Sequence, residues 1–231
     1  MRWWLGLGMA AAVSGSAHAA QFDLNATIVS DARFRGESVS NRQPAFEAAG
    51  QVVQGDWFAG IDATSNAYSR APLAASGHHA EFDVSGGWSH SFGILTPSAG
   101  VIGYVYPGAR RADYVEVFGA LTGSLGPFGL TGGVNFAPGQ GNLPRDSLYL
   151  YLTPSVAIPA TPITLKASFG REAGALQGGP RAKFDYGVAV EAKVARRITL
   201  SARWTANSLG AAAYDRRMAR GGVAVGVGAG F

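Results

Sequence analysis

Cysteine is absent from this sequence, and its absence excludes a disulfide scaffold, a thiol nucleophile and a thiolate metal site. Histidine is scarce, with four residues in the chain. Charged residues make up only 15% of the sequence, against about 25% in an average soluble domain. We therefore expect no metal site, no cofactor and no enzymatic activity, and we do not expect an ordinary soluble domain.

Long hydrophobic runs are also missing beyond the N-terminus. No stretch of about 18 apolar residues occurs there, which excludes a membrane-spanning helix. The formal net charge of +4 is too small to indicate nucleic acid as a partner. Glycine, in contrast, is abundant, with 33 residues that lack the three-residue period of collagen.

The N-terminus has the pattern of an export signal. Arg2 precedes an apolar stretch over residues 3–13. Small residues follow, and the segment ends in the A-x-A pattern formed by Ala17, His18 and Ala19. This order is typical of a secretory signal peptide. We predict that residues 1–19 are removed after Ala19 and that residues 20–231 form one exported domain, as in a bacterial outer-membrane protein.

From Phe22 onward, apolar and polar residues alternate with a period of two. In residues 80–89, for example, Phe82 and Val84 alternate with Glu81 and Asp83. Such alternation predicts strands with one apolar face and one polar face. We expect strands at residues 22–31, 45–54, 57–66, 80–89, 94–106, 113–122, 128–137, 147–156, 163–170, 184–193, 198–205 and 222–231.

The connections between these segments alternate in length. Short connections such as residues 55–56 and 194–197 are separated by long ones such as residues 32–44 and 206–221. An up-and-down barrel with short periplasmic turns and longer extracellular loops requires this order, and a Greek-key sandwich does not. The predicted fold is all-β: a transmembrane antiparallel β-barrel of about 12 strands.

Aromatic residues at the apolar positions gather near both ends of the predicted strands. The periplasmic set is Phe22, Trp57, Trp88, Phe128 and Phe231, and the extracellular set is Phe46, Phe82, Phe136, Phe169, Phe184 and Trp204. Two such belts mark the two interfaces of a bilayer. We expect the barrel to lie in the outer membrane, in contact with outer-membrane lipids and lipopolysaccharide.

The last predicted strand ends with an aromatic residue, Phe231. This ending resembles the signal that the barrel assembly machinery reads in outer-membrane proteins, so we expect that machinery to be a partner. Glycines such as Gly226 and Gly228 alternate with valines in the same strand, and as small inward residues they permit tight curvature.

Three segments resemble the TorF family of proteobacterial porins. Residues 30–46 (SDARFRGESVSNRQPAF) match the opening S-D-x-x-F-R-G-x-S signature of that family. Residues 104–108 (YVYPG) and 113–118 (DYVEVF) resemble its Y-x-Y-P and D-Y-x-E segments. The resemblance implies an exported barrel that serves as a channel, and it names no solute.

Two arginines, Arg33 and Arg35, stand just beyond the extracellular end of the first predicted strand. Their guanidinium groups could bind a carboxylate or phosphate of an incoming solute, or the phosphates of lipopolysaccharide. Alternatively, they could fold the first loop into the barrel mouth by pairing with Glu47, Asp62 or Glu116. The sequence leaves both interpretations open, and we favour the second.

The polar positions of the predicted strands would line the lumen. The ionisable ones are Asp23, Glu47, Asp62, Glu81, Asp83, Glu116, Lys166, Asp185, Glu191, Lys193 and Arg203. A barrel of this size falls between small filled barrels and wide porins, so we expect a narrow lumen that the first loop partly blocks. The excess of carboxylates predicts a mild preference for cations among the small hydrophilic solutes that would pass.

Two alternatives to a channel remain. The lumen could be filled by its own side chains, which would leave a structural or surface-interaction barrel. The barrel could also be a lipid-modifying hydrolase, because His78 and His79 lie near Ser76 and Asp83 at the expected level of the outer leaflet. Neither a G-x-S-x-G nor an H-x-x-x-H spacing accompanies these histidines, so we rank the hydrolase last.

Overall fold

The computed structural model describes residues 19–72, 74, 77, 79–213 and 215–231. Residues 1–18 of the predicted signal peptide lie outside this range, and cleavage after Ala19 stays a prediction. Within the described residues, no helix is long and apolar enough to cross a membrane.

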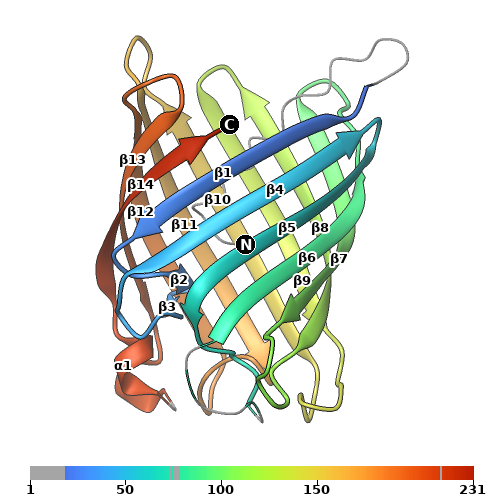
Figure 1. Cartoon of the computed structure of the whole chain (residues 1–231), viewed down its shortest axis with the longest axis vertical. Coiled ribbons are helices and arrows are strands. Elements are labelled where there is room, and N and C mark those ends of the chain that lie inside the picture. Colours follow the sequence, from blue (N-terminus) through green and yellow to red (C-terminus); the bar gives the residue numbers. More distant parts are fainter. Residues whose placement is uncertain (1–18, 73, 75–76, 78, 214) are drawn as a thin grey trace.

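Twelve antiparallel strands close into a single barrel (Figure 1). Each strand pairs with its neighbours along the chain, and β1 closes the ring by pairing with both β4 and β14. The predicted all-β up-and-down barrel is therefore confirmed. Its strands are β1 (Gln21–Val29), β4 (Ala45–Gln54), β5 (Trp57–Ala67), β6 (His79–Ser89), β7 (Leu95–Val105), β8 (Tyr114–Leu125), β9 (Phe128–Ala137), β10 (Ser147–Ala157), β11 (Ile163–Gly174), β12 (Lys183–Lys193), β13 (Ile198–Asn207) and β14 (Gly222–Gly230).

Short and long connections gather at opposite ends of the barrel. In Figure 1 the short turns and the end of β14 lie at the top, and we call this the turn end. The longer loops lie at the bottom, and we call this the loop end. The loop end also holds four small elements: β2 (Arg33–Phe34), β3 (Glu37–Ser38), the 3-10 helix η1 (Gly210–Ala212) and helix α1 (Arg216–Ala219).

Several strands differ from their predicted limits at the loop end. β1 ends at Val29 rather than residue 31, because the chain turns into the β2–β3 hairpin. β11 continues past residue 170 to Gly174, so its alternation brings Glu172 onto the inward face. Gly170 keeps that ladder regular, because a Cβ at this position would collide with the ring of Tyr149.

The outward face of the barrel is apolar and exposed. The predicted aromatic residues lie on it near both ends, with Phe22 71% and Trp57 67% exposed at the turn end and Phe169 56% and Phe184 52% exposed at the loop end. Leucine, isoleucine and valine occupy the outward positions between them. A surface of this kind needs an apolar surrounding, because contact of so much hydrocarbon with water is costly.

The apolar core lies inside the loop end rather than between two sheets. Residues of the folded loops, such as Phe34, Val39 and Leu176, are buried there against residues of the wall such as Tyr104 and Val29. Burial of these side chains holds the loops in the mouth of the barrel. Many of the remaining inward positions are polar, charged or glycine, but Phe58 and Phe118 also face inward, with 6.3 Å between their ring centres.

Candidate functional site

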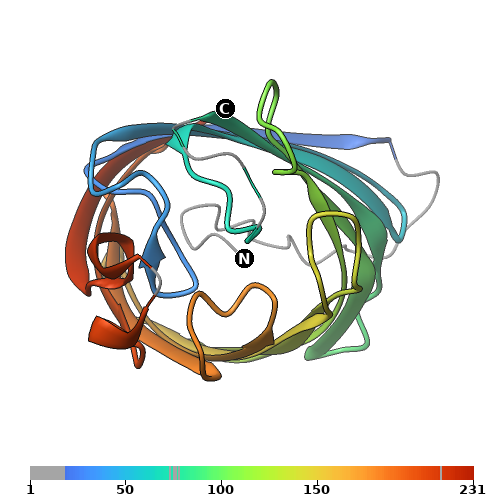
Figure 2. The same ribbon diagram turned by 90° about the horizontal axis from the view of Figure 1, so that it is seen from below.

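The first loop enters the barrel. Residues 30–44 connect β1 to β4, and within them β2 and β3 pair as a small hairpin, with Arg33 opposite Ser38 and Phe34 opposite Glu37. Figure 2, which views the barrel from the loop end, shows this blue hairpin inside the ring of strands. The hairpin therefore narrows the lumen from within.

The tip of this hairpin is a two-residue turn formed by Arg35 and Gly36. Their φ angles are 46° and 78°, and positive φ at both central positions gives the twist that two-residue hairpins require. Gly36 lies so close to β12 and β13 that a Cβ would be 2.6 Å from the Cβ of Asp185 and 2.8 Å from the carbonyl oxygen of Ala206. Its own carbonyl accepts a hydrogen bond of 3.0 Å from the Asn207 amide.

We expect Gly36→Ala to undock the hairpin and to destabilise the barrel by more than the ~1–2 kcal/mol of a left-handed alanine. The matched control is Gly93→Ala, since Gly93 has a φ of 62° and a Cβ there would meet nothing within 4 Å. The measurement is the urea midpoint of unfolding in detergent micelles. Equal shifts for both variants would show that the close contact of Gly36 with the wall contributes nothing.

Arg33 fastens the base of the hairpin. Its Nη1 atom donates to Asp31 Oδ2 at 2.6 Å, and its Nε atom donates to Thr205 Oγ1 on β13 at 2.6 Å. Nη2 donates to the carbonyl of Arg220 at 2.8 Å. Ser38 adds a hydrogen bond of 2.5 Å to the same Asp31 carboxylate. Arg33 is thus occupied by internal partners, which favours the structural interpretation of this residue.

Arg35 links the hairpin tip to two strands of the wall. Its guanidinium makes a bidentate pair with Glu116 on β8, at 2.9 and 2.6 Å, and Nη1 also donates to Glu172 on β11 at 2.7 Å. The guanidinium carbon lies 4.7 Å from the ring centre of Phe34 and 4.2 Å from that of Tyr149. Two carboxylates and two aromatic faces therefore hold this one side chain.

Glu172 is the centre of a larger network. Besides Arg35, it accepts hydrogen bonds from Arg70 in the loop after β5, and it forms an ion pair of 2.8 Å with Lys183 on β12. Glu37 of the hairpin lies 3.3 Å from both Arg70 and Lys183. We call these groups, together with Glu116, the mouth network. Its three cations and three carboxylates balance in charge, and all are largely buried.

The two loop arginines of the mouth network stay charged. Burial by itself lowers the pKa of Arg35, but the carboxylates of Glu116 and Glu172 outweigh burial and hold the pKa well above its ordinary value. For Arg70, likewise, burial lowers the pKa, and Glu172 and Glu37 raise it further than burial lowers it. Both arginines are consequently charged at any pH the cell meets.

Glu116 is fully engaged at the level of the hairpin tip. Besides Arg35, its carboxylate accepts hydrogen bonds from the hydroxyl of Tyr104 at 3.1 Å and the amide of Asn135 at 3.0 Å. The ring of Tyr104 in turn stacks on Tyr114 at 4.4 Å between ring centres. The predicted pairing of Arg35 with Glu116 is thus present in the structure, and Glu172 is its additional partner.

A second charged region lies on three neighbouring strands. Asp62 on β5 stands directly opposite Asp83 on β6, and Thr64 lies between Glu47 on β4 and Glu81 on β6. We call the four carboxylates the acidic wall. The strands β4, β5 and β6 contribute no lysine or arginine, and Arg203 on β13 interacts electrostatically with Glu47.

The other predicted lumen residues also lie inward, and among them Asp185 adjoins the hairpin tip at Gly36. Lys166 and Glu191 form an ion pair of 2.7 Å between β11 and β12. Asp185 accepts a hydrogen bond of 3.1 Å from the Tyr149 hydroxyl. The remaining three also occupy inward positions: Asp23 near the turn end of β1, Lys193 near the turn end of β12 and the buried Arg203 on β13.

Four members of the mouth network are not among the predicted site residues. The alternation places Glu172 and Lys183 in a loop between two predicted strands, whereas they lie in β11 and β12. Glu37 and Arg70 lie in connections between barrel strands, whose course a period-two pattern does not describe. For Glu172 a signal existed, since continuing the alternation of Lys166, Ser168 and Gly170 places it inward. For Arg70 we find no comparable local signal.

Of the two histidines of the hydrolase hypothesis, the structure describes His79. Ser76 and His78 lie outside the described residues. His79 begins β6 on the same face as Asp83, and that face points into the lumen rather than toward the outside.

Comparisons with known proteins give one family and a common fold. The model of the family Gcw_chp, described as a bacterial protein of unknown function, matches residues 12–227. No curated protein matches. Among solved structures, the NanC porin is 10% identical over 91% of this chain and 99% of its own, with a TM-score of 0.57. The COG4313 outer-membrane channel from Pseudomonas putida F1 is 9% identical over 94% and 98%, with a TM-score of 0.56. These TM-scores establish a shared barrel fold, and at identities this low they establish the fold alone.

Proposed function

This chain belongs to the Gcw_chp family of bacterial proteins, and from that premise we propose that it forms a narrow outer-membrane channel for passive diffusion of small hydrophilic solutes or ions. The observation that carries the proposal is the contrast between the two faces of the closed barrel. Its outward side chains are mostly apolar, and many of its inward side chains are polar or charged. A barrel of this kind suits a lipid surrounding and a hydrated interior.

The membrane position follows from the same contrast. Outer-membrane lipids and lipopolysaccharide would cover the apolar face, the turn end would face the periplasm and the loop end would face outward. The exposed Phe231 at the end of the chain would be the group that the assembly machinery binds. The two structures of similar fold are a porin and an outer-membrane channel, which supports this placement.

The first loop would set the constriction. Its residues 30–46 carry the TorF-like signature, and residues 33–38 of that signature form the hairpin inside the mouth. The porin resemblance and the position of the hairpin thus point to the same segment. Arg33 and Arg35 act here as anchors of the loop, since carboxylates of the chain itself already occupy both guanidinium groups.

The excess of carboxylates over cations at the predicted lumen positions would favour cations. We expect Asp62→Asn to lower the cation-to-anion permeability ratio by about twofold, because one charge beside a hydrated ion is worth no more than about 1 kcal/mol. The measurement is the reversal potential across a planar bilayer in a salt gradient. Asp146→Asn is the control, since Asp146 is exposed at the loop end and asparagine can still accept the hydrogen bond from the Gly139 amide. An unchanged reversal potential for Asp62→Asn would mean that the carboxylate of Asp62 does not contribute to ion selectivity.

A second candidate is a permanently closed barrel whose function lies in its surface. The buried mouth network favours it, because the loops and the wall fill the loop end with paired charges and apolar side chains. Single-channel recording separates the two. Discrete current steps from the purified protein would support the channel, and a folded, heat-modifiable protein that carries no current would support the closed barrel.

A further inference from the structure

Arg171 breaks the pattern of the outward face. It pairs in register with Leu150 on β10 and Phe184 on β12, and both of these are exposed outward residues. Throughout the twelve barrel strands, every residue of which the structure describes, Arg171 is the only charged residue at an outward position. An isolated cation on a lipid-facing surface is costly unless a partner lies there.

Among the described residues, Arg171 has no anionic partner. Arg171 is exposed and, within the described part of the chain, its guanidinium forms no salt bridge. The contact it does make is with the ring of Phe184, 6.0 Å from the guanidinium carbon. This position is three residues before the loop end of β11, level with the aromatic belt where lipid headgroups begin.

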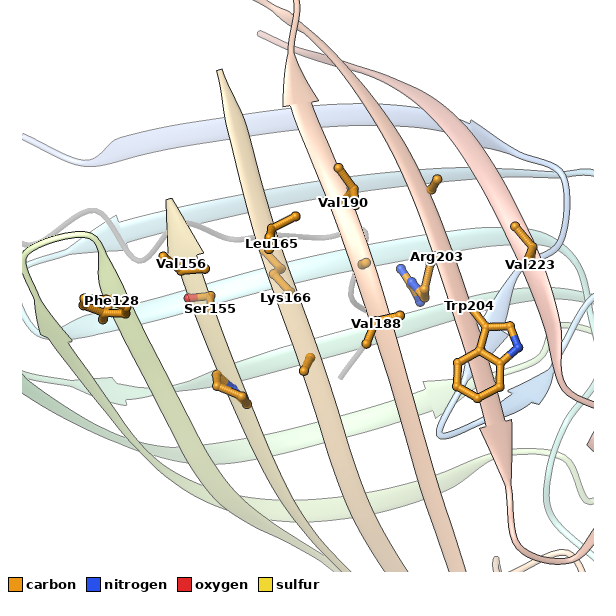
Figure 3. Close-up of a pocket in the computed structure, with 14 residues that line it drawn as sticks. Phe128, Ser155, Val156, Leu165, Lys166, Val188, Val190, Arg203, Trp204 and Val223 are labelled. Atoms are coloured by element: carbon orange, nitrogen blue, oxygen red, sulfur yellow. The ribbon is translucent and has the colours of Figure 1, made fainter. Parts of the chain in front are cut away.

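An apolar groove lies on the same face, closer to the turn end than Arg171 is. Its volume is about 590 Å³ and it crosses the outer surface from β9 to β14. Figure 3 shows Phe128 at one side and Trp204 and Val223 at the other, with Leu165, Val188 and Val190 between them. The small side chains of Ala167 and Ala202 line the groove between these larger ones.

The register connects the cation to the groove. Arg171 and Phe184 form one outward pair, Phe169 and Tyr186 form the next toward the turn end, and Ala167 and Val188 follow. Successive outward pairs are about 7 Å apart along a strand. The groove therefore begins about two pairs from the guanidinium toward the turn end, which is the direction in which an acyl chain leaves its headgroup.

We propose that Arg171 and this groove form a binding site for a phosphate-bearing membrane lipid, with the phosphate on the guanidinium and an acyl chain in the groove. The site rests on the membrane placement in the proposed function. A guanidinium fork matches phosphate oxygens, and the groove takes the hydrocarbon. A second copy of the barrel does not fit as well, because its outward strand positions offer no carboxylate to Arg171.

Native mass spectrometry of the purified protein tests the site. Phosphatidylglycerol is the probe, and diacylglycerol with the same acyl chains reports the groove without a phosphate. We expect Arg171→Gln to weaken phosphatidylglycerol binding about tenfold, as loss of a charge-assisted hydrogen bond does, and to leave diacylglycerol binding unchanged. Ala202→Leu, which fills the groove, should weaken the binding of both lipids.

The matched control is Arg110→Gln, because Arg110 is an exposed loop-end arginine outside the strands. Equal binding of phosphatidylglycerol to the Arg171 and Arg110 variants would overturn the site. Binding of inorganic phosphate alone, with no contribution from the acyl chains, would overturn the groove. A separate measurement, co-flotation of the protein with phosphatidylcholine vesicles, tests the membrane placement on which the site rests. A barrel that does not enter these vesicles contradicts the proposed function, whereas a barrel that enters them and fails the lipid-binding test contradicts the lipid site alone.

Discussion

Replacing Arg35 with alanine should raise the single-channel conductance several times over. This side chain ties the tip of the first-loop hairpin to Glu116 and Glu172, and the rings of Phe34 and Tyr149 hold it from both sides. Removing it leaves both carboxylates without their shared partner and frees the hairpin to leave the lumen. A lumen that loses its constriction conducts more ions per unit time.

Arg110→Ala is the control for this experiment, because it removes an exposed arginine from another loop at the same end of the barrel. Its conductance should equal that of the unaltered protein. A reversal potential recorded in parallel should shift toward cations in Arg35→Ala, since Glu116 and Glu172 then add their charge to the lumen. Unchanged conductance in Arg35→Ala would mean that the hairpin does not form the constriction.

The strands could be predicted because the environment of each side chain depends only on its position along its own strand. Each strand faces hydrocarbon on one side and the lumen on the other, so the required residue type changes at every position. Outward aromatic residues such as Phe22, Trp57 and Phe184 then mark where the strands reach the interfaces. The inward position of Glu47, Asp62 and the other predicted lumen residues follows from this alternation, and the barrel follows when the alternating connection lengths and the aromatic belts are added.

The mouth network could not be predicted in the same way, because its contacts join distant parts of the chain. Arg70 and Glu172 are 102 positions apart, and Arg35 and Glu172 are 137 apart. No periodicity relates a residue in one loop to a residue in another strand. Glu172 was within reach of the alternation rule, but which cations surround it depends on how three loops pack inside the mouth.

The choice between the two interpretations of Arg35 depends on the structure for a related reason. From the sequence it could bind a solute anion or pair with a carboxylate of the wall, and the residue type suits both roles. The hairpin turn decides between them, because positive φ at Arg35 and the absence of a Cβ at Gly36 let the tip lie directly against β12 and β13. The guanidinium then meets Glu116 and Glu172 within the protein.

Glu172→Gln should be the most destabilising single substitution in the mouth network. The fully buried carboxylate of Glu172 meets Arg35, Arg70 and Lys183. Glutamine keeps the shape and removes the charge, so three buried cations lose their common partner. Removing one side of a buried ion pair costs about 3–5 kcal/mol, and we expect a loss of that order in the free energy of unfolding, measured from urea curves of tryptophan fluorescence.

Glu191→Gln provides the matched comparison, because its partner Lys166 and Glu191 itself are both partly exposed. Solvent screens that pair, so its loss should cost less than about 1 kcal/mol. The double variant Glu172→Gln with Lys183→Gln should regain part of the stability lost by Glu172→Gln, since it removes one of the stranded cations along with the carboxylate. Two results would contradict this account: a double variant less stable than the sum of its single changes predicts, or a Glu172→Gln variant that loses no more stability than Glu191→Gln. In either case the mouth network does not hold the loops in the barrel. Burial of apolar residues such as Phe34 and Leu176 must then hold them instead.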